Sequence, residues 1–206
     1  MVATRPAHYD TATVRVDKIV VGPYENNAYV VRCKGTGDAV LIDAANEHEL
    51  LVPLCRSLGV RRVLTTHGHF DHIQAVTAAR DAGLDVGIFS DDADMLPSYD
   101  FVIEDDTEYE VGDLRLRTIH NPGHTPGSVS FLLEDHPLLF TGDTLFPGGP
   151  GNVSGHPRAS FDQIIESIDH RLFTLPADLI VLPGHGLDTT IGSERPHLQE
   201  WVDRGW

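Results

Sequence analysis

The stretch Thr65-Thr66-His67-Gly68-His69-Phe70-Asp71-His72 holds three histidines and one aspartate within six residues, directly after the expected strand 60–65. Side chains two residues apart in an extended segment point the same way, so His67 and His69 can bind one metal ion. Asp71 and His72 come where the chain turns into the expected helix 71–82, so they can offer a carboxylate and an imidazole to a second ion. The stretch therefore predicts a metal centre at a strand end, with a spacing that suits two ions better than one.

Three further candidate ligands follow other expected strands in glycine-containing loops. His124 follows the strand 114–119, Asp143 follows the strand 138–141, and His185 follows the strand 179–182. Loops at strand ends are where rigid scaffolds usually display reactive groups, and glycine lets the backbone approach an ion or a substrate closely. Each residue alone would suit a surface or turn position, but together they predict one ligand set: His67, His69, Asp71, His72, His124, Asp143 and His185.

The rest of the chain alternates between strand and helix patterns. Strands are expected at 13–21, 28–32 and 39–42, followed by a helix from Asn46 with leucines at helical spacing. Further strands are expected at 84–89 and 129–133 and a helix at 161–172, whereas the acidic segment 91–110 is predicted to be a solvated loop. Antiparallel strands on both sides of βα units predict an α/β fold with two mixed sheets face to face and helices outside. We expect one domain over residues 1–206.

Charge and composition limit the partners. Thirty-one acidic and fifteen basic residues give a net charge of −16, and no cluster of lysine and arginine could neutralise a row of phosphates, so nucleic acid is not an expected partner. No apolar run is long enough to span a membrane, and the first ten residues do not have the pattern of a secretory signal. Cys33 and Cys55 are the only cysteines and form no CxxC motif. A cytoplasmic protein without a membrane partner is therefore expected.

The pattern His67-x-His69-x-Asp71-His72, followed by His124, Asp143 and His185, resembles the metallo-β-lactamase-fold hydrolase superfamily over nearly the whole chain. Segments 122–128, 141–146 and 183–186 are most similar to its glyoxalase II branch, particularly to short bacterial members that consist of the metal domain alone. The resemblance implies a four-layer αβ/βα sandwich with the metals at one edge between the sheets. It assigns His67, His69 and His124 to one ion and Asp71, His72 and His185 to the other. Asp143 would bridge both ions, and Asp43 would orient a ligand from behind.

Two divalent ions are the expected cofactors, with zinc first and iron or manganese as alternatives, because sites with carboxylates discriminate poorly among first-row metals. Ions that share Asp143 would lower the pKa of a bridging water from about 15.7 toward about 7, and the resulting hydroxide would attack a carbonyl carbon. Asp71 and Asp143 are the expected catalytic carboxylates. Because a thiolate can leave without prior protonation and an amide nitrogen cannot, the predicted activity is hydrolysis of a small-molecule thioester.

Other activities within the superfamily stay open. A thiol-persulfide dioxygenase would hold a single iron through His67, His124 and Asp143, and a lactonase would use the same ligands as a thioesterase. β-Lactamases resemble this chain less, because they generally lack the acid that Asp143 supplies. Ribonuclease members would not suit the net charge of −16.

Substrate contacts are expected from the segment that follows Asp143. Phe146 and the loop 147–158 would line the mouth of the site, with Asn152, His156 and Arg158 as polar groups. Arg158 would serve either as an anion contact or as an ordinary surface arginine. The resemblance to full-length glyoxalase II is limited to the metal domain, and no cation stands in Gly151-Asn152-Val153-Ser154, where the family commonly holds glutathione. Another low-molecular-weight thiol is therefore expected as the carrier.

Overall fold

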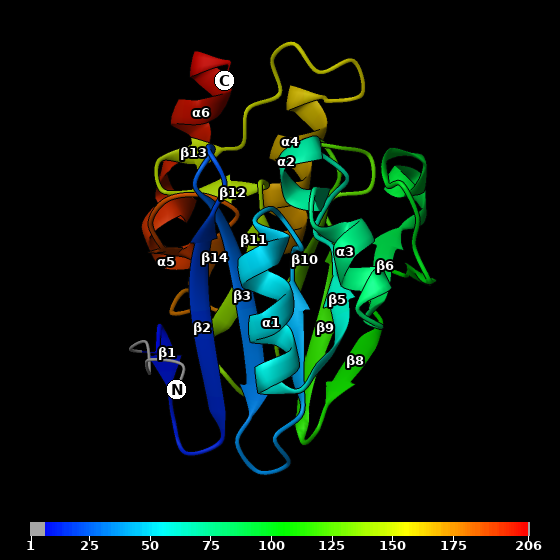
Figure 1. The fold of residues 1–206 in the computed structure, drawn as a ribbon. Helices are drawn as coiled ribbons and strands as arrows, with labels where there is room; N and C mark the ends of the chain where they lie inside the picture. Colours follow the sequence, from blue (N-terminus) through cyan, green and yellow to red (C-terminus); the bar gives the residue numbers. More distant parts are fainter. Residues whose placement is uncertain (1–6, 206) are drawn as a thin grey trace.

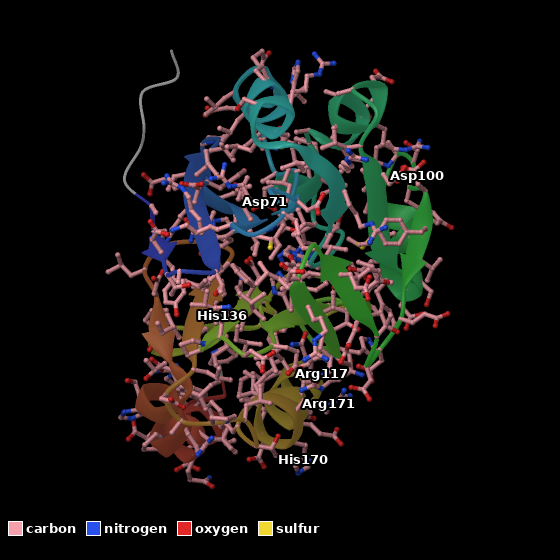
Figure 2. All side chains as sticks on the ribbon, turned by 90° about the horizontal axis from the view of Figure 1, so that it is seen from below. Asp71, Asp100, Arg117, His136, His170 and Arg171 are labelled. Carbon is pink, nitrogen blue, oxygen red and sulfur yellow. The ribbon has the colours of Figure 1, made fainter. Side chains whose placement is uncertain are left out.

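Two mixed β-sheets stack face to face, and helices cover the outer surface of each sheet (Figure 1). The computed structural model describes residues 7–205. Residues 1–6 and 206 lie outside the described residues. The prediction that the first ten residues form no secretory signal therefore falls mostly outside them. Seen along the strands, the order of the layers is helix, sheet, sheet and helix (Figure 2). The predicted αβ/βα sandwich is confirmed.

The first sheet changes from antiparallel to parallel along its width. Its order is β1 (Tyr9–Asp10), β2 (Val14–Val21), β3 (Asn26–Cys33), β4 (Ala39–Ile42), β5 (Val60–Leu64), β6 (Asp85–Phe89) and β7 (Phe101–Ile103). Strands β1 to β4 are antiparallel neighbours, and β4 to β7 are parallel. Parallel neighbours need crossover connections, which here contain α1 (His48–Leu58), α2 (Phe70–Ile73), α3 (Val76–Asp81) and the 3₁₀ turn Ser90–Met95.

The second sheet is antiparallel except for one central pair. Its order is β15 (Thr189–Thr190), β14 (Ile180–Pro183), β11 (Leu138–Gly142), β10 (Val129–Leu133), β9 (Leu114–His120) and β8 (Glu108–Val111), with β11 and β14 parallel. A small ribbon of β12 (Leu145–Phe146) and β13 (Gly149–Pro150) lies beside it. The outer face of the second sheet carries α4 (Phe161–Ser167), which continues into a wider turn at Ile168–Leu172, followed by α5 (Ile191–Glu194), the 3₁₀ turn Arg195–His197 and α6 (Leu198–Arg204).

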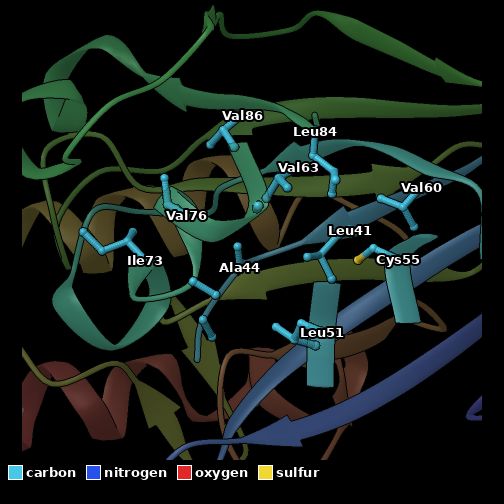
Figure 3. Close-up of a cluster of buried hydrophobic side chains, with 14 of the residues drawn as sticks. Leu41, Ala44, Leu51, Cys55, Val60, Val63, Ile73, Val76, Leu84 and Val86 are labelled. Carbon is cyan, nitrogen blue, oxygen red and sulfur yellow. The ribbon is translucent and has the colours of Figure 1, made fainter. Parts of the chain in front are cut away.

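Three buried apolar clusters separate the four layers. Tyr29, Phe131 and Phe140 belong to the cluster between the sheets, and Trp201 belongs to the cluster under the helices of the second sheet. The third cluster lies between the first sheet and its helices, where α1 contributes Leu51 and Cys55 (Figure 3). Burial raises the pKa of the Cys55 thiol to about 12, in keeping with a packed apolar residue. Within residues 7–205, no helix has both the length and the hydropathy of a membrane span.

Two sequence predictions about local structure are wrong. The expected helix 71–82 is interrupted, because the backbone N–H groups of Gln74 and Ala75 donate to the carbonyls of Ala45 and Ala44 instead of continuing the helix. The segment 91–110 is not a solvated loop, since it contains β7, the start of β8 and most of the turn at Ser90–Met95. Tertiary contacts outweigh local sequence preference in both cases.

The strand ends place the candidate ligands at one end of the sandwich. Strands β4, β5, β9, β11 and β14 all end there, and each is followed by a loop that carries a predicted site residue. Backbone contacts join the two sheets at this end: the Asn27 N–H donates to the Gly184 carbonyl at 2.7 Å, and the Val129 N–H donates to the Thr66 carbonyl at 2.9 Å. The loops of both sheets are therefore held at fixed positions relative to each other.

Candidate metal centre

The seven predicted ligands come together in overlapping groups of three. In each group the potential ligand atoms lie within 4.8 Å of one another. The first triad is His67, His69 and His124, and the second triad is Asp71, His72 and His185. A third group joins His67 and His72 to Asp143. These two triads are the sets that the resemblance assigns to the two ions.

Asp143 lies between the triads. Its Oδ1 is 3.4 Å from His72 Nε2, and its Oδ2 is 3.4 Å from His185 Nε2 and 3.7 Å from His124 Nε2. The carboxylate follows β11 directly, and the parallel neighbour β14 brings the loop of His185 next to it. This position suits a carboxylate shared by two ions.

Two buried polar atoms test whether a cation fits here. His67 Nε2 and Asp143 Oδ1 are both buried without a hydrogen-bond partner among the described residues. An unpartnered buried polar atom costs about 1–3 kcal/mol, which a bound cation would offset. Imidazole nitrogens and carboxylate oxygens are also the donors that divalent zinc, iron and manganese accept. The residues present therefore fit divalent metal ions.

Three of the histidines are held from behind through Nδ1. His72 Nδ1 donates to Asp43 Oδ2 at 2.8 Å, His124 Nδ1 donates to the Asn152 carbonyl at 2.9 Å, and His185 Nδ1 donates to the Tyr24 carbonyl at 2.8 Å. Each bond fixes the ring orientation and turns Nε2 toward the other candidate ligands. The sequence pointed to Asp43, whereas the two carbonyl contacts carry no side-chain signal that could have revealed them.

Asp43 and Asn26 support the site from the first sheet. Asp43 is 1% exposed and also accepts hydrogen bonds from the backbone N–H and the hydroxyl of Thr66, at 2.7 and 2.8 Å. Asn26 Nδ2 donates to Asp71 Oδ2 at 2.9 Å, and Asp71 Oδ2 is 3.3 Å from His185 Nε2. Two ligands of the second triad are thus held by side chains of the first sheet, His72 by Asp43 and Asp71 by Asn26.

Burial and close charges shift the titration of these groups. Burial lowers the pKa of His67 well below its usual value and lowers that of His69 to about 4. Burial would raise the pKa of Asp143, but His72 and His185 outweigh it and hold that pKa well below the usual range. Burial would likewise lower the pKa of His185, but its contacts with Asp143 and Asp71 raise it to about 10. Asp143 is therefore ionised at neutral pH, as a carboxylate that binds a cation must be.

The four predicted substrate contacts have different surroundings. The Phe146 ring lies 6.4 Å from the His185 ring, and the His156 ring lies 4.6 Å from the His69 ring, so both border the ligands. Asn152 holds His124 through its carbonyl, and its side-chain oxygen accepts from the Ser154 N–H. Arg158 Nη1 is 2.9 Å from Asp94 Oδ1 in an exposed ion pair.

Large apolar side chains are exposed around the same end. Tyr24, Phe70 and Leu187 are 64%, 71% and 80% exposed. Tyr24 contacts His185 through its carbonyl, Phe70 stands between His69 and Asp71, and Leu187 follows His185 by two residues. The sequence interpretation did not single out these residues, and it also missed Asp92, which is completely buried beside Gly68.

Comparison with known proteins identifies the family and agrees with the fold. The metallo-beta-lactamase superfamily profile matches residues 21–185. The hydroxyacylglutathione hydrolase GloC of Haemophilus influenzae is 32% identical, over 77% of this chain and 84% of its own length. The solved BLEG-1 B3 metallo-beta-lactamase is similar with a TM-score of 0.81 and 29% identity, covering 88% of this chain and 97% of its own.

A second solved structure, that of TTHA1623 in a di-iron-bound form, has a TM-score of 0.77 and 31% identity, covering 86% of this chain and 96% of its own. The segment matched by the superfamily profile runs from the end of β2 to His185, and it therefore contains all seven candidate ligands. The chain belongs to the metallo-β-lactamase superfamily.

Proposed function

We propose that this chain is a binuclear metallohydrolase that cleaves the thioester of a small thiol. The position of Asp143 carries the proposal: its Oδ1 is buried and unpartnered, and its carboxylate lies within 3.7 Å of histidine nitrogens from both triads. One carboxylate between two complete triads favours two ions. A mononuclear iron dioxygenase that holds its iron through His67, His124 and Asp143 would leave the whole second triad without a metal to bind.

When bound, divalent ions would lower the pKa of a water and polarise the carbonyl oxygen of the substrate. The chain holds the ligands in place before the substrate arrives, because Asp43 and the carbonyls of Asn152 and Tyr24 fix three imidazoles. Asp71 and Asp143 are the proposed catalytic carboxylates. Burial opposes ionisation of Asp71, but its contacts with His185, His72 and Asn26 lower its pKa well below the usual value.

The bond that is cleaved follows from the leaving group. A thiolate, whose parent thiol has a pKa of about 8.5, can leave without first receiving a proton, whereas an amide nitrogen cannot. The name of the Haemophilus influenzae relative, hydroxyacylglutathione hydrolase, supports the same bond. Zinc is the proposed metal, and the di-iron form of the solved relative keeps iron as an alternative.

The charge and polarity of the surface around the site indicate which kind of thiol carries the acyl group. Arg158 is paired with Asp94, and Lys18 donates to the Gly186 carbonyl and to Asp188, so both cations already have partners. Tyr24, Phe70 and Leu187 make the neighbouring surface apolar. This supports a thiol with less charge than glutathione as the carrier.

Metal-loaded protein assayed with matched substrates tests the proposal. We expect hydrolysis of S-lactoylglutathione and of the lactoyl thioester of an uncharged thiol such as N-acetylcysteamine, and no hydrolysis of the corresponding amide. The uncharged thioester is expected to give the larger kcat/KM. A chromogenic β-lactam and oxygen uptake with a glutathione persulfide are the competing assays. Activity in either of them without thioester hydrolysis would overturn the proposal.

Replacing Arg158 with alanine is expected to leave the KM for S-lactoylglutathione within about twofold of the unaltered protein. The reason is that the guanidinium already binds Asp94 at the surface, where such pairs contribute little. Steady-state kinetics measures the effect, and Arg80→Ala, which breaks the partly exposed pair with Asp100, is the matched control. A tenfold rise in KM confined to Arg158→Ala would show that Arg158 binds the substrate anion.

A further inference from the structure

We propose that Asp92 is a positioning residue for the first triad, His67, His69 and His124. The inference rests on the proposed binuclear centre and assigns a role to a carboxylate that touches none of the candidate ligand side chains. Asp92 lies in the turn Ser90–Met95 that follows β6, and it is completely buried. Its neighbours Asp91 and Asp94 are exposed, so the burial of Asp92 sets it apart within this acidic turn.

The contacts of Asp92 reach both ligand loops of the first triad. Its Oδ2 accepts from the backbone N–H of Gly68 at 2.8 Å and from the hydroxyl of Thr125 at 2.6 Å. Its Oδ1 accepts from the backbone N–H of Gly127 at 2.8 Å. Gly68 separates His67 from His69, and Thr125 follows His124. One carboxylate therefore ties the backbone between two ligands to the loop that carries the third.

The glycines at both loops allow this close approach. A Cβ at Gly127 would lie 2.7 Å from the carboxyl carbon of Asp92, and a Cβ at Gly68 would lie 2.7 Å from Met95 Cβ and 3.2 Å from Asp92 Cβ. Gly68 is thus required not only for flexibility between the histidines but for packing against the turn that carries Asp92. The hydrogen bonds and the steric fit point to the same function.

A buried carboxylate is costly unless it is fully hydrogen-bonded. The described residues provide Asp92 with no ion pair, so its stabilisation comes from the three donors of the ligand loops. Losing one acceptor oxygen would leave a buried donor without a partner and release one loop from the other. Because a metal site depends on the orientation of its ligands, the expected effect is weaker metal binding by the first triad alone.

The test compares Asp92→Asn with Glu194→Gln in metal titrations. Glu194 is the matched control, since it is a buried carboxylate that accepts from the backbone N–H of Gly148 and from the hydroxyl of Thr189, neither of which belongs to the segments 67–69 and 124–127 that Asp92 joins. Cobalt absorption spectra and direct metal analysis report the ions bound. We expect Asp92→Asn to bind one ion normally and the other about 10- to 100-fold more weakly. Glu194→Gln should bind both ions normally.

Combined substitutions show which ion is affected. In a His185→Ala background, which impairs the second triad, Asp92→Asn should still weaken the binding of the remaining ion. In a His124→Ala background, which impairs the first triad, Asp92→Asn should have no further effect, because coupled residues are not additive. The inference is wrong if Asp92→Asn lowers the metal affinity equally in both backgrounds. It is also wrong if the Asp92→Asn protein binds both ions with unchanged affinity.

A gentler variant keeps the test decisive if Asp92→Asn does not fold. Thr125→Val preserves the shape of the side chain and removes one of the donors to Asp92, and a smaller loss of affinity for the same ion is expected. Unchanged affinity would count against the inference. Failure of the proposed function would look different, since the unaltered protein would then bind fewer than two ions or would not hydrolyse thioesters.

Discussion

Replacing Asp143 with alanine is expected to abolish thioester hydrolysis and to leave neither ion tightly bound. The carboxylate stands within 3.7 Å of His72, His124 and His185, so both triads lose the group that lies between them. Metal ions typically supply several kcal/mol of stabilisation to developing charge, which corresponds to a loss on the order of 10³-fold in kcat/KM. Metal analysis and thioester kinetics on the same sample measure both effects.

The fold should survive this substitution, because Asp143 belongs to none of the apolar clusters. Circular dichroism in the near ultraviolet checks this directly. Asp178→Ala serves as a control for the loss of one negative charge, since Asp178 is exposed. An Asp143→Ala protein that retained two ions and a tenth or more of the activity would refute the bridging role.

Adding a single methyl group at Gly184 is the second change with a large expected effect. A Cβ there would lie 2.2 Å from Asp143 Oδ1 and 2.7 Å from His72 Cε1. His72 cannot easily move aside, because its Nδ1 is bound to the buried Asp43. We therefore expect Gly184→Ala to displace Asp143, to weaken binding of both ions and to reduce kcat/KM by on the order of 10²-fold.

Gly186→Ala separates this effect from a general loss of stability. Gly186 has a φ of +68°, and a Cβ added to it would meet no other atom within 4 Å, so alanine there is strained but enters no occupied space. It should lower the melting temperature, through a backbone cost of about 1–2 kcal/mol, while the protein still binds two ions. Normal metal content and activity in Gly184→Ala would mean that the ions do not depend on the gap between Asp143 and His72.

The convergence of the seven candidate ligands could be predicted because its signals are local. Histidine and aspartate stand beside glycine directly after apolar strands, and the strand pattern itself indicates that such loops meet at one edge of a sheet. The interruption of the helix 71–82 could not be predicted, since it depends on the carbonyls of Ala44 and Ala45, which approach only in the folded chain. Sequence patterns within one element do not contain that contact.

Asp92 illustrates the same limit for the site. It stands among other acids, Asp91 and Asp94, and a run of charges normally indicates a solvated segment. Its burial depends on donors that come from Gly68, Thr125 and Gly127, which lie 24 to 35 positions away in the sequence. Arg158 was open to two interpretations for the same reason, because its pairing with Asp94 links residues 64 positions apart.

Both triads draw their members from the two sheets. His67, His69, Asp71 and His72 follow β5 of the first sheet, whereas His124, Asp143 and His185 follow strands of the second. Ions bound by such ligands would act as removable cross-links between the halves of the sandwich. A ligand that binds only the folded chain adds about 4.1 kcal/mol of stability at a free concentration of about 1,000 Kd. Metal supply would then govern what fraction of the protein is folded as well as whether it reacts.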